Sequence, residues 1–306
     1  MALKLDLPNL LIVGAAKSGT TSLHNYLKQH PQIYMSDHKE PHFLINSEIG
    51  KDRIHKAILK LEHYKEMFKT QEHYLYKGES SVMYLAYPQY SIKNIRKYLS
   101  PKVKIIIMLR NPVERAFAGY LHNLRYNPME DLTFDEALNA SEERYIQNKN
   151  ISPDTRYLHV GMYFSQVSSF LAEFKDNVHI IFYDDYVEDI NNCLEKVFAF
   201  LDLENIKVDT SIRHMQGGWR FRNKFLRNIL IPDNKIKSFF KMIISNKKIR
   251  SLLRKKVMHY GTVKTNKLSI EMTRKLTHYY QDDIRKLSHL LNRDLSHWVK
   301  SVDRPD

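Results

Sequence analysis

The sequence predicts an α/β fold in which a parallel β-sheet is flanked by helices on both faces. Short apolar runs alternate with amphipathic segments along the 306 residues, and this alternation is typical of parallel sheets. The first and third runs, at residues 10–14 and 104–110, hold four and five consecutive apolar residues, as expected for strands buried on both faces. The chain has 43% hydrophobic and 27% charged residues and no internal repeat. We therefore expect one globular domain over residues 1–306, with a basic helical segment at about 226–260.

Four apolar runs are the predicted strands. The first, LLIVG, has four consecutive apolar residues and ends at a glycine. The third, KIIIMLR, is strongly apolar over its whole length. The four runs cover residues 10–14, 74–78, 104–110 and 177–183.

Amphipathic segments between these runs are the predicted helices. After the first strand, Leu23, Tyr26 and Leu27 follow helical spacing, and the pattern stops before Pro31. Pro112 suits the first turn of another helix. The polar residues 127–150 predict an excursion with a short helix. Further helices are expected over residues 161–174, 194–201 and 276–291.

Cysteine content and hydropathy limit the classes of protein that fit. The single cysteine, Cys193, excludes a disulfide within the chain and argues against a cysteine-based zinc site. Its apolar spacing with Val197 indicates a packed helix residue. No stretch reaches the ~18 apolar residues of a membrane span, and LLIV is too short for a signal peptide. The sequence therefore predicts a soluble, cytoplasmic protein.

The segment GAAKSGTT, residues 14–21, has the composition of a phosphate-binding loop. It joins a strand to a helix N-terminus, where backbone amides and the helix dipole favour an anion, and Lys17 adds a cation. Gly14 and Gly19 have the spacing of the kinase pattern G-x-x-x-x-G-K-[ST], but Thr20 stands where that pattern has lysine. The third strand ends in Arg110 rather than in an aspartate that could hold Mg²⁺. A P-loop nucleotide kinase is therefore a disfavoured alternative.

Four segments together resemble one enzyme family. GAAKSGTTSLHNYL, KEPHFL, IIMLRNPVERAFAGYLH and LNRDLSHW occur in this order over nearly the whole chain. They resemble motifs of the sulfotransferases that depend on 3′-phosphoadenosine 5′-phosphosulfate (PAPS). The likeness is to the branch that contains heparan sulfate sulfotransferases and many bacterial enzymes. The resemblance implies a single sulfotransferase domain with a P-loop-like sheet, PAPS as co-substrate, 3′-phosphoadenosine 5′-phosphate (PAP) as product, and no metal.

The resemblance also implies catalytic roles. Glu40 matches the general base that takes the proton of the acceptor, and Lys39 precedes it. Lys17 matches the lysine that stabilises charge on the leaving oxygens. His122 matches a histidine at the catalytic face of some members. From the residues alone, Glu40 could equally be a surface carboxylate and His122 a structural histidine.

Two regions are expected to hold the nucleotide besides the phosphate loop. Arg110 matches the ligand of the 3′-phosphate, although the family's serine eight residues later is Ala118 here. The segment RHMQGGWRFRNKF, residues 213–225, resembles the loop that closes over the nucleotide, with Trp219 as a candidate for stacking on adenine. The predicted nucleotide-binding residues are Lys17, Ser18, Gly19, Thr20, Thr21, Ser22, Arg110, Gly217, Gly218, Trp219, Arg220 and Arg222.

The acceptor is left open by the sequence. Related enzymes often have lysine at Ser80 and proline at Val82, so the sequence argues against a heparan-like polymer, although Ser80 and Ser81 are expected near the sulfuryl or acceptor site. Residues 45–72 and 127–160 are the expected acceptor loops. Glycans, lipids, phenols and small metabolites stay open, as do O- and N-sulfation and the oligomeric state.

Most of the net charge of +14 lies in one segment. Between Arg213 and Lys256 there are fourteen Lys and Arg residues against one acid, Asp233. This predicts an anionic partner: a nucleotide, an acidic glycan or a membrane surface. The alternative is an amphipathic helix packed on the domain with its lysines in solvent. A non-catalytic binder of membranes or nucleic acid is a third interpretation of the chain, but no nucleic-acid motif is present.

Overall fold

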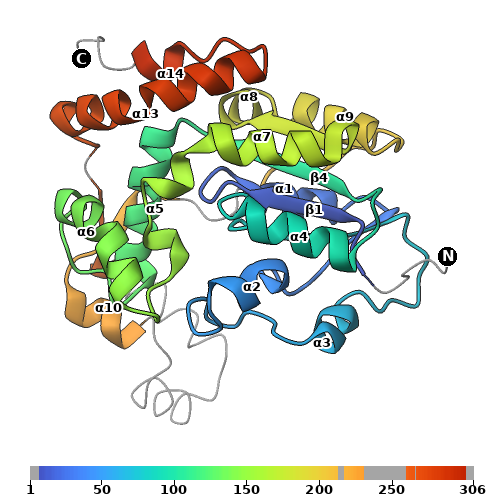
Figure 1. Ribbon diagram of the computed structural model, residues 1–306, viewed down its shortest axis with the longest axis horizontal. Coiled ribbons are helices and arrows are strands. Elements are labelled where there is room, and N and C mark those ends of the chain that lie inside the picture. Colours follow the sequence, from blue (N-terminus) through green and yellow to red (C-terminus); the bar gives the residue numbers. More distant parts are fainter. Residues whose placement is uncertain (1–6, 213–216, 231–259, 266, 301–306) are drawn as a thin grey trace.

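The computed structural model describes residues 7–212, 217–230, 260–265 and 267–300. Within them a parallel sheet of five strands has the order β2-β3-β1-β4-β5 and lies between layers of helices (Figure 1). The predicted fold class is therefore confirmed. The strands are β1 (Leu10–Gly14), β2 (Ile33–Met35), β3 (Tyr76–Ser80), β4 (Lys104–Leu109) and β5 (Val178–Phe182).

Four of the five strands correspond to the four predicted runs. β3 begins and ends two residues later than expected, and its register pairs Gly78 with Leu10 of β1. β2 was missed because its three residues are too few to show a pattern in the sequence. It pairs with β3 at the edge of the sheet, so that sheet neighbours rather than local sequence define it as a strand.

Alternate residues of the central strands supply two separate cores. Leu11 and Ile105 face the larger core, which is completed by α2, α4, α5, α7 and α13. Ile12 and Ile106 face the smaller core, formed with α1, α8 and α9, where Cys193 is buried. The helices are α1 (Thr20–Leu27), α2 (Phe43–Ile49), α3 (Leu61–Glu66), α4 (Pro88–Tyr98), α5 (Pro112–Tyr126), α6 (Phe134–Gln147), α7 (Tyr163–Phe174), α8 (Tyr183–Glu188), α9 (Ile190–Phe200), α10 (Lys224–Leu230), α13 (Ile270–Leu290) and α14 (His297–Lys300).

The predicted helices are present, with differences in length. The helix expected within residues 127–150 is α6, whose fourteen residues begin after a capping box made by Thr133 and Glu136. α2, α3, α4 and α8 had not been predicted. A second small sheet, in which β6 (Trp219–Phe221) and β7 (Thr262–Lys264) are antiparallel, was also not foreseen.

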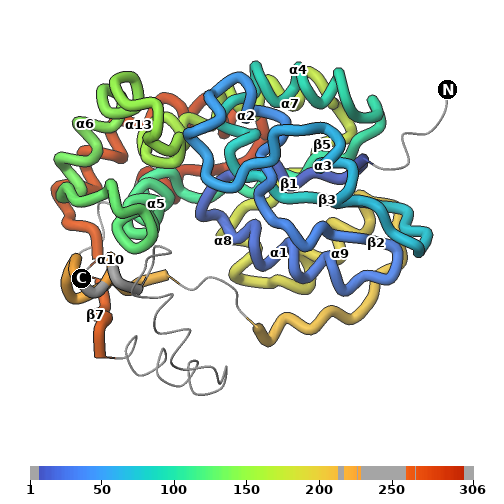
Figure 2. The backbone as a smooth tube through the Cα atoms, turned by 90° about the horizontal axis from the view of Figure 1, so that it is seen from below, coloured from blue at the N-terminus to red at the C-terminus, as the bar shows by residue number. Residues whose placement is uncertain are grey.

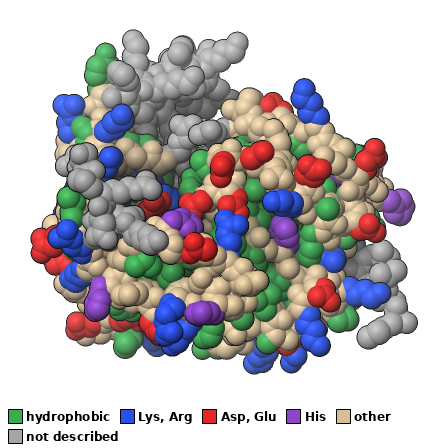
Figure 3. All heavy atoms as spheres, turned by 90° about the horizontal axis from the view of Figure 1, so that it is seen from above, with side chains coloured by type: hydrophobic (Ala, Val, Ile, Leu, Met, Phe, Trp, Pro, Cys, Tyr) green, Lys and Arg blue, Asp and Glu red, His purple; other side chains and the backbone are tan. Residues whose placement is uncertain are grey.

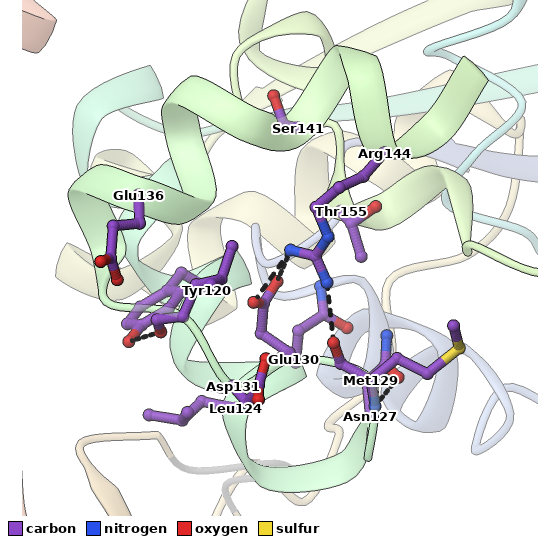
Figure 4. Close-up of polar contacts among 12 residues, drawn as sticks. Tyr120, Leu124, Asn127, Met129, Glu130, Asp131, Glu136, Ser141, Arg144 and Thr155 are labelled. Carbon is purple, nitrogen blue, oxygen red and sulfur yellow. Dashed lines mark hydrogen bonds and ion pairs between the residues drawn. The ribbon is translucent and has the colours of Figure 1, made fainter. Parts of the chain in front are cut away.

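A buried carboxylate anchors the chain that follows α5. Glu130 is fully buried, accepts two hydrogen bonds from Arg144 of α6 at 3.1 and 3.2 Å (Figure 4), and accepts one from the hydroxyl of Tyr157. Arg144 also donates to the carbonyl of Met129 at 2.7 Å. These contacts fix the C-terminal end of α5 against α6. α10 lies beside the same end of α5 (Figures 1 and 2).

The basic helical segment predicted at about 226–260 lies mostly outside the described residues, since positions 231–259 are not described. Over the described part of the face seen in Figure 3, acidic and basic side chains are interspersed. This agrees with the nearly neutral charge of the chain outside residues 213–256. No helix among the described residues is both long and apolar enough to span a membrane.

Candidate active site

The phosphate loop lies at the carboxyl end of β1, between two strands of the sheet. A Cβ at Gly14 would lie 2.6 Å from Cβ of Leu85, so only glycine fits there. Gly19 is the N-cap of α1 with a left-handed φ of 92°, which glycine adopts without strain. The first amides of a helix lack partners within it, so the N-terminus of α1 and the side chain of Lys17 together suit an anion.

A cavity of about 1810 Å³ opens in front of this loop. It is larger than the roughly 300–1,000 Å³ of a typical small-molecule pocket, so it can hold two substrates. Its lining brings together sequence-distant residues of the prediction: Lys17, Gly19, Thr20, Thr21, Ser22, Glu40, Arg110, His122, Gly217 and Gly218.

Lys17 and His122 form a pair inside the cavity. Nζ of Lys17 lies 3.1 Å from Nδ1 of His122. Burial, and then the charge of Arg125, lower the pKa of Lys17 to about 8. Burial, and then the charge of Lys17, lower the pKa of His122 to about 3. At neutral pH an ammonium therefore donates to a neutral imidazole, whose remaining proton is on Nε2.

Glu40 is held on a short loop whose backbone is bound to the end of β3. Its N–H donates to the carbonyl of Ser80 at 2.9 Å, and its φ of 63° is left-handed. Lys39 Nζ lies 2.5 Å from one carboxylate oxygen, and His42 Nε2 lies 3.4 Å from the other. Burial raises the pKa of Glu40, but Lys39 and then His42 outweigh it and hold that pKa well below its usual range. The carboxylate is therefore ionised.

Ser80 and Ser81 do not lie where the sequence suggested, since both are fully buried and neither lines the cavity. Ser81 accepts the N–H of His42 at 3.0 Å and donates to Glu79 at 2.7 Å. Ser80 Oγ contacts His24 Nδ1 at 2.8 Å. Their role is to fix the loop of Glu40. Beneath them the buried Glu79 also accepts from the hydroxyls of Tyr64 and Tyr84.

Arg110 extends from the end of β4 to the lip of the cavity. Its Nε and Nη2 donate to the same oxygen of Glu114, at 3.1 and 2.7 Å, and its Nη1 donates to the carbonyl of Lys17 at 3.3 Å. Arg110 therefore forms an ion pair at the start of α5 and also lines the cavity. Ala118 lines the same wall, so the hydroxyl expected in the family is missing there.

The remaining predicted residues are divided between the cavity and its surroundings. Ser18 is buried behind the loop, and Lys39 reaches the site only through Glu40. Arg220 and Arg222 are exposed and do not line the cavity. Trp219 packs against Tyr126, with the two ring centroids 6.3 Å apart, and does not line the cavity. Their nucleotide contacts stay predictions, and residues 213–216 of the same segment lie outside the described residues.

The cavity is also lined by His42, Asp154 and Arg125, which were not singled out from the sequence. His42 belongs to the KEPH segment, which could have indicated it. Asp154 and Arg125 lie outside any motif. Asp154 Oδ1 is buried without a hydrogen-bond partner, and burial raises the pKa of Asp154. The wall around Asp154 includes residues 52–56 and 150–154, which belong to the two expected acceptor loops. Among the described residues, no group of three His, Cys, Asp or Glu is placed to hold a metal ion.

Comparison with known proteins places the chain among related domains. A family model described as "Sulfotransferase domain" matches residues 7–289. A sulfotransferase structure from Alicyclobacillus acidocaldarius is similar, with a TM-score of 0.72 and 30% identity, over 95% of this chain and 98% of that chain. Human carbohydrate sulfotransferase 15 is 26% identical over 74% of this chain and 52% of that protein. Mouse bifunctional heparan sulfate N-deacetylase/N-sulfotransferase 1 is 28% identical over 56% of this chain and 19% of that protein. The chain thus spans about half the length, or less, of these curated relatives.

Proposed function

Because the chain belongs to the sulfotransferase domain family, we propose that it transfers a sulfuryl group from PAPS to an acceptor hydroxyl or amine and releases PAP. The observation that carries the proposal is the composition of one cavity. It joins a phosphate loop, a guanidinium at the end of β4 and an ionised carboxylate. The first two suit a nucleotide with phosphates at both ends, and the third suits removal of a proton from an acceptor.

The proposed reaction is an in-line displacement at sulfur. The lone pair of the acceptor oxygen or nitrogen forms a bond to sulfur, while the bond from sulfur to the 5′-phosphate oxygen breaks. The electron pair of that bond stays on the phosphate, where the ammonium of Lys17 stabilises it. The proton of the acceptor passes to the carboxylate of Glu40.

Glu40 can act as this base only after a rearrangement of its ion pairs. Lys39 covers one carboxylate oxygen at 2.5 Å and keeps the pKa of Glu40 low, so the carboxylate of the empty site is a weak base. An acceptor hydroxyl that displaces Lys39 takes over this oxygen and raises the basicity of Glu40. Lys39 is then free to contact the nucleotide. Neutral His122 orients the ammonium of Lys17 through Nδ1.

A carbohydrate is the acceptor class that we propose. Two of the relatives are named for carbohydrate and heparan sulfate sulfotransfer. The match to each of them covers more than half of this chain. The part of the cavity lined by residues 52–56 and 150–154 provides polar and charged side chains for sugar hydroxyls. Lipid, phenol and small-metabolite acceptors are the other outcomes of the test below.

The test combines nucleotide binding with transfer. Calorimetric titration should show that PAP binds at least about tenfold more tightly than AMP, because a 3′-phosphate adds a charged contact to Arg110. The Arg110→Gln variant should remove most of this difference. Incubation with sulfur-labelled PAPS and a panel of glycans, lipids and phenols should label the glycans. Equal affinities for PAP and AMP, or no labelled product from any acceptor class, would contradict the proposal.

A further inference from the structure

Arg125, near the C-terminus of α5, is a buried cation that faces the cavity. Only 4% of its surface is exposed. Its Nη1 donates to the carbonyl of Trp219 at 3.2 Å, and its Nε is buried without a hydrogen-bond partner. The guanidinium also lies 5.0 Å from the centre of the Trp219 ring. Arg125 forms no salt bridge with a carboxylate of the described residues, and burial lowers the pKa of its guanidinium.

Arg227 of α10 shows what a satisfied arginine looks like in the same neighbourhood. It is equally buried, at 4% exposed, and it does not line the cavity. It donates to the carbonyls of Leu124 and Glu130 at 3.2 and 2.8 Å, and to that of Pro128 at 3.3 Å. Its Nε donates to Asn228. Arg227 therefore closes the end of α5 structurally, whereas Arg125 lines the cavity and has a donor without a hydrogen-bond partner.

A buried cation without a partner is costly, because desolvation is not repaid by a hydrogen-bonded anion. The cost is increased by Lys17, since Arg125 lowers the pKa of Lys17 more than Glu40 or Asp154 raises it. His122, which contacts Lys17, is a neutral imidazole and therefore compensates the charge of neither Lys17 nor Arg125. Two cations that repel each other thus line the same cavity, and an anionic ligand group near both would compensate them.

The position of Arg125 on α5 decides which anionic group it can reach. α5 rises by about 1.5 Å per residue, so Arg125 lies roughly 20 Å along the helix from Pro112, which follows Arg110. The backbone of Arg110, the residue assigned to the 3′-phosphate, therefore lies beyond the other end of α5. Arg125 lies one helical turn beyond His122, which contacts the loop lysine at the 5′ end of the proposed nucleotide.

We propose that Arg125 binds the sulfonate oxygens of PAPS opposite Lys17, as a catalytic residue that holds the sulfuryl group during transfer. The inference rests on the proposed function and deepens it. The planar guanidinium offers two adjacent donors to two sulfonate oxygens, while Lys17 stays with the oxygen that bridges sulfur and phosphorus. A sulfuryl group held by both cations cannot rotate out of line with the acceptor at Glu40.

The test compares PAPS with PAP, because these two nucleotides differ only in the sulfonate. Titration of Arg125→Gln at low temperature without acceptor should show PAPS binding weakened by about tenfold and PAP binding unchanged. Arg125→Lys keeps the charge but not the fork, so its loss of PAPS affinity should be smaller. Unchanged PAP affinity also shows that each variant is folded.

Arg227→Gln is the matched control, because it removes an equally buried arginine that does not face the cavity. It should bind PAPS and PAP in the wild-type ratio. If Arg125→Gln weakens both nucleotides equally or neither, the inference is wrong. If the variant changes only KM for an acidic acceptor, Arg125 binds an anion of the acceptor, and the inference is again wrong. A wild-type protein that binds neither nucleotide would instead refute the proposed function.

Discussion

The two sides of the cavity are built in different ways. On the nucleotide side, residues 14–22 supply an anion site that is continuous in sequence and consists largely of backbone amides. On the Glu40 side, a single carboxylate projects from a loop held by the carbonyl of Ser80 and the hydroxyl of Ser81, which in turn donates to the buried Glu79. In the proposed mechanism, binding is thus distributed over many groups, whereas proton removal is concentrated in Glu40.

This difference predicts different responses to substitution. No single side-chain change on the nucleotide side can remove the loop amides, so such changes should alter affinity by modest factors. On the Glu40 side, the carboxylate has no evident substitute at the same position, so its loss should affect turnover almost alone. The three predictions below test the contrast, from the largest expected effect to the smallest.

Glu40→Gln should reduce kcat by about 10²–10⁴-fold, because the amide cannot accept the acceptor proton. The dissociation constant for PAP should stay near the wild-type value, since the phosphate loop is untouched. Steady-state kinetics and calorimetry measure the two quantities. Glu62→Gln, an exposed residue of α3 that does not line the cavity, is the control and should behave as wild type. Near-normal kcat in Glu40→Gln would place the base elsewhere, with Asp154 the first candidate.

The pH profile should depend on Lys17 more than on any histidine. Lowering of the Lys17 pKa to about 8 means that its ammonium is present below this pH and lost above it. kcat/KM should therefore fall by about tenfold per pH unit above roughly pH 8, as expected for one essential proton. The lowered pKa of Glu40 keeps its carboxylate ionised at neutral pH, and His122, with a pKa of about 3, is already neutral there.

Lys17→Arg provides the comparison for this profile. Arginine stays protonated, so the alkaline decline should disappear even if overall activity is lower. An inflection near pH 6.5 in the wild-type protein would show instead that a histidine with an ordinary pKa controls the reaction, and the assignment of Lys17 would fail.

The sequence was most informative where structure and chemistry are local. The phosphate loop could be recognised because Gly14, Lys17 and Gly19 lie within six residues and each satisfies a local requirement. The strands β1 and β4 were found because burial on both faces gives continuous apolar runs. The edge strand β5 is only partly buried, and its apolar residues Ile180, Ile181 and Phe182 indicated it. β2 and β6 have three residues each, and pairing partners far along the chain define them.

The functions of individual polar residues were harder to predict, because they depend on distant neighbours. Ser80 and Ser81 follow directly from a predicted strand, yet their buried partners His24, His42 and Glu79 decide that they support the loop. The contrast between Arg125 and Arg227 became clear only in the structure, since it lies in the carbonyl groups that accept hydrogen bonds from each. Such differences arise from packing between elements and leave no periodic pattern.

The smallest expected effect concerns the ion pair at the lip of the cavity. Glu114 holds two donors of Arg110 and is itself exposed, so it competes with a 3′-phosphate for the same guanidinium. Glu114→Gln should therefore tighten PAP binding by about twofold to fivefold, the range expected for an exposed ion pair, and leave AMP binding unchanged.

Glu173→Gln, which breaks a second ion pair with Arg96 away from the cavity, is the matched control for Glu114→Gln and should change neither affinity. The gain in PAP affinity should shrink as salt is raised, because the competing charge is screened. Weaker PAP binding in Glu114→Gln would mean that Glu114 orients Arg110 for the phosphate. If PAP affinity is unchanged in both Glu114→Gln and Arg110→Gln, Arg110 does not bind the nucleotide. Nucleotide binding would then not be distributed between Arg110 and the phosphate loop.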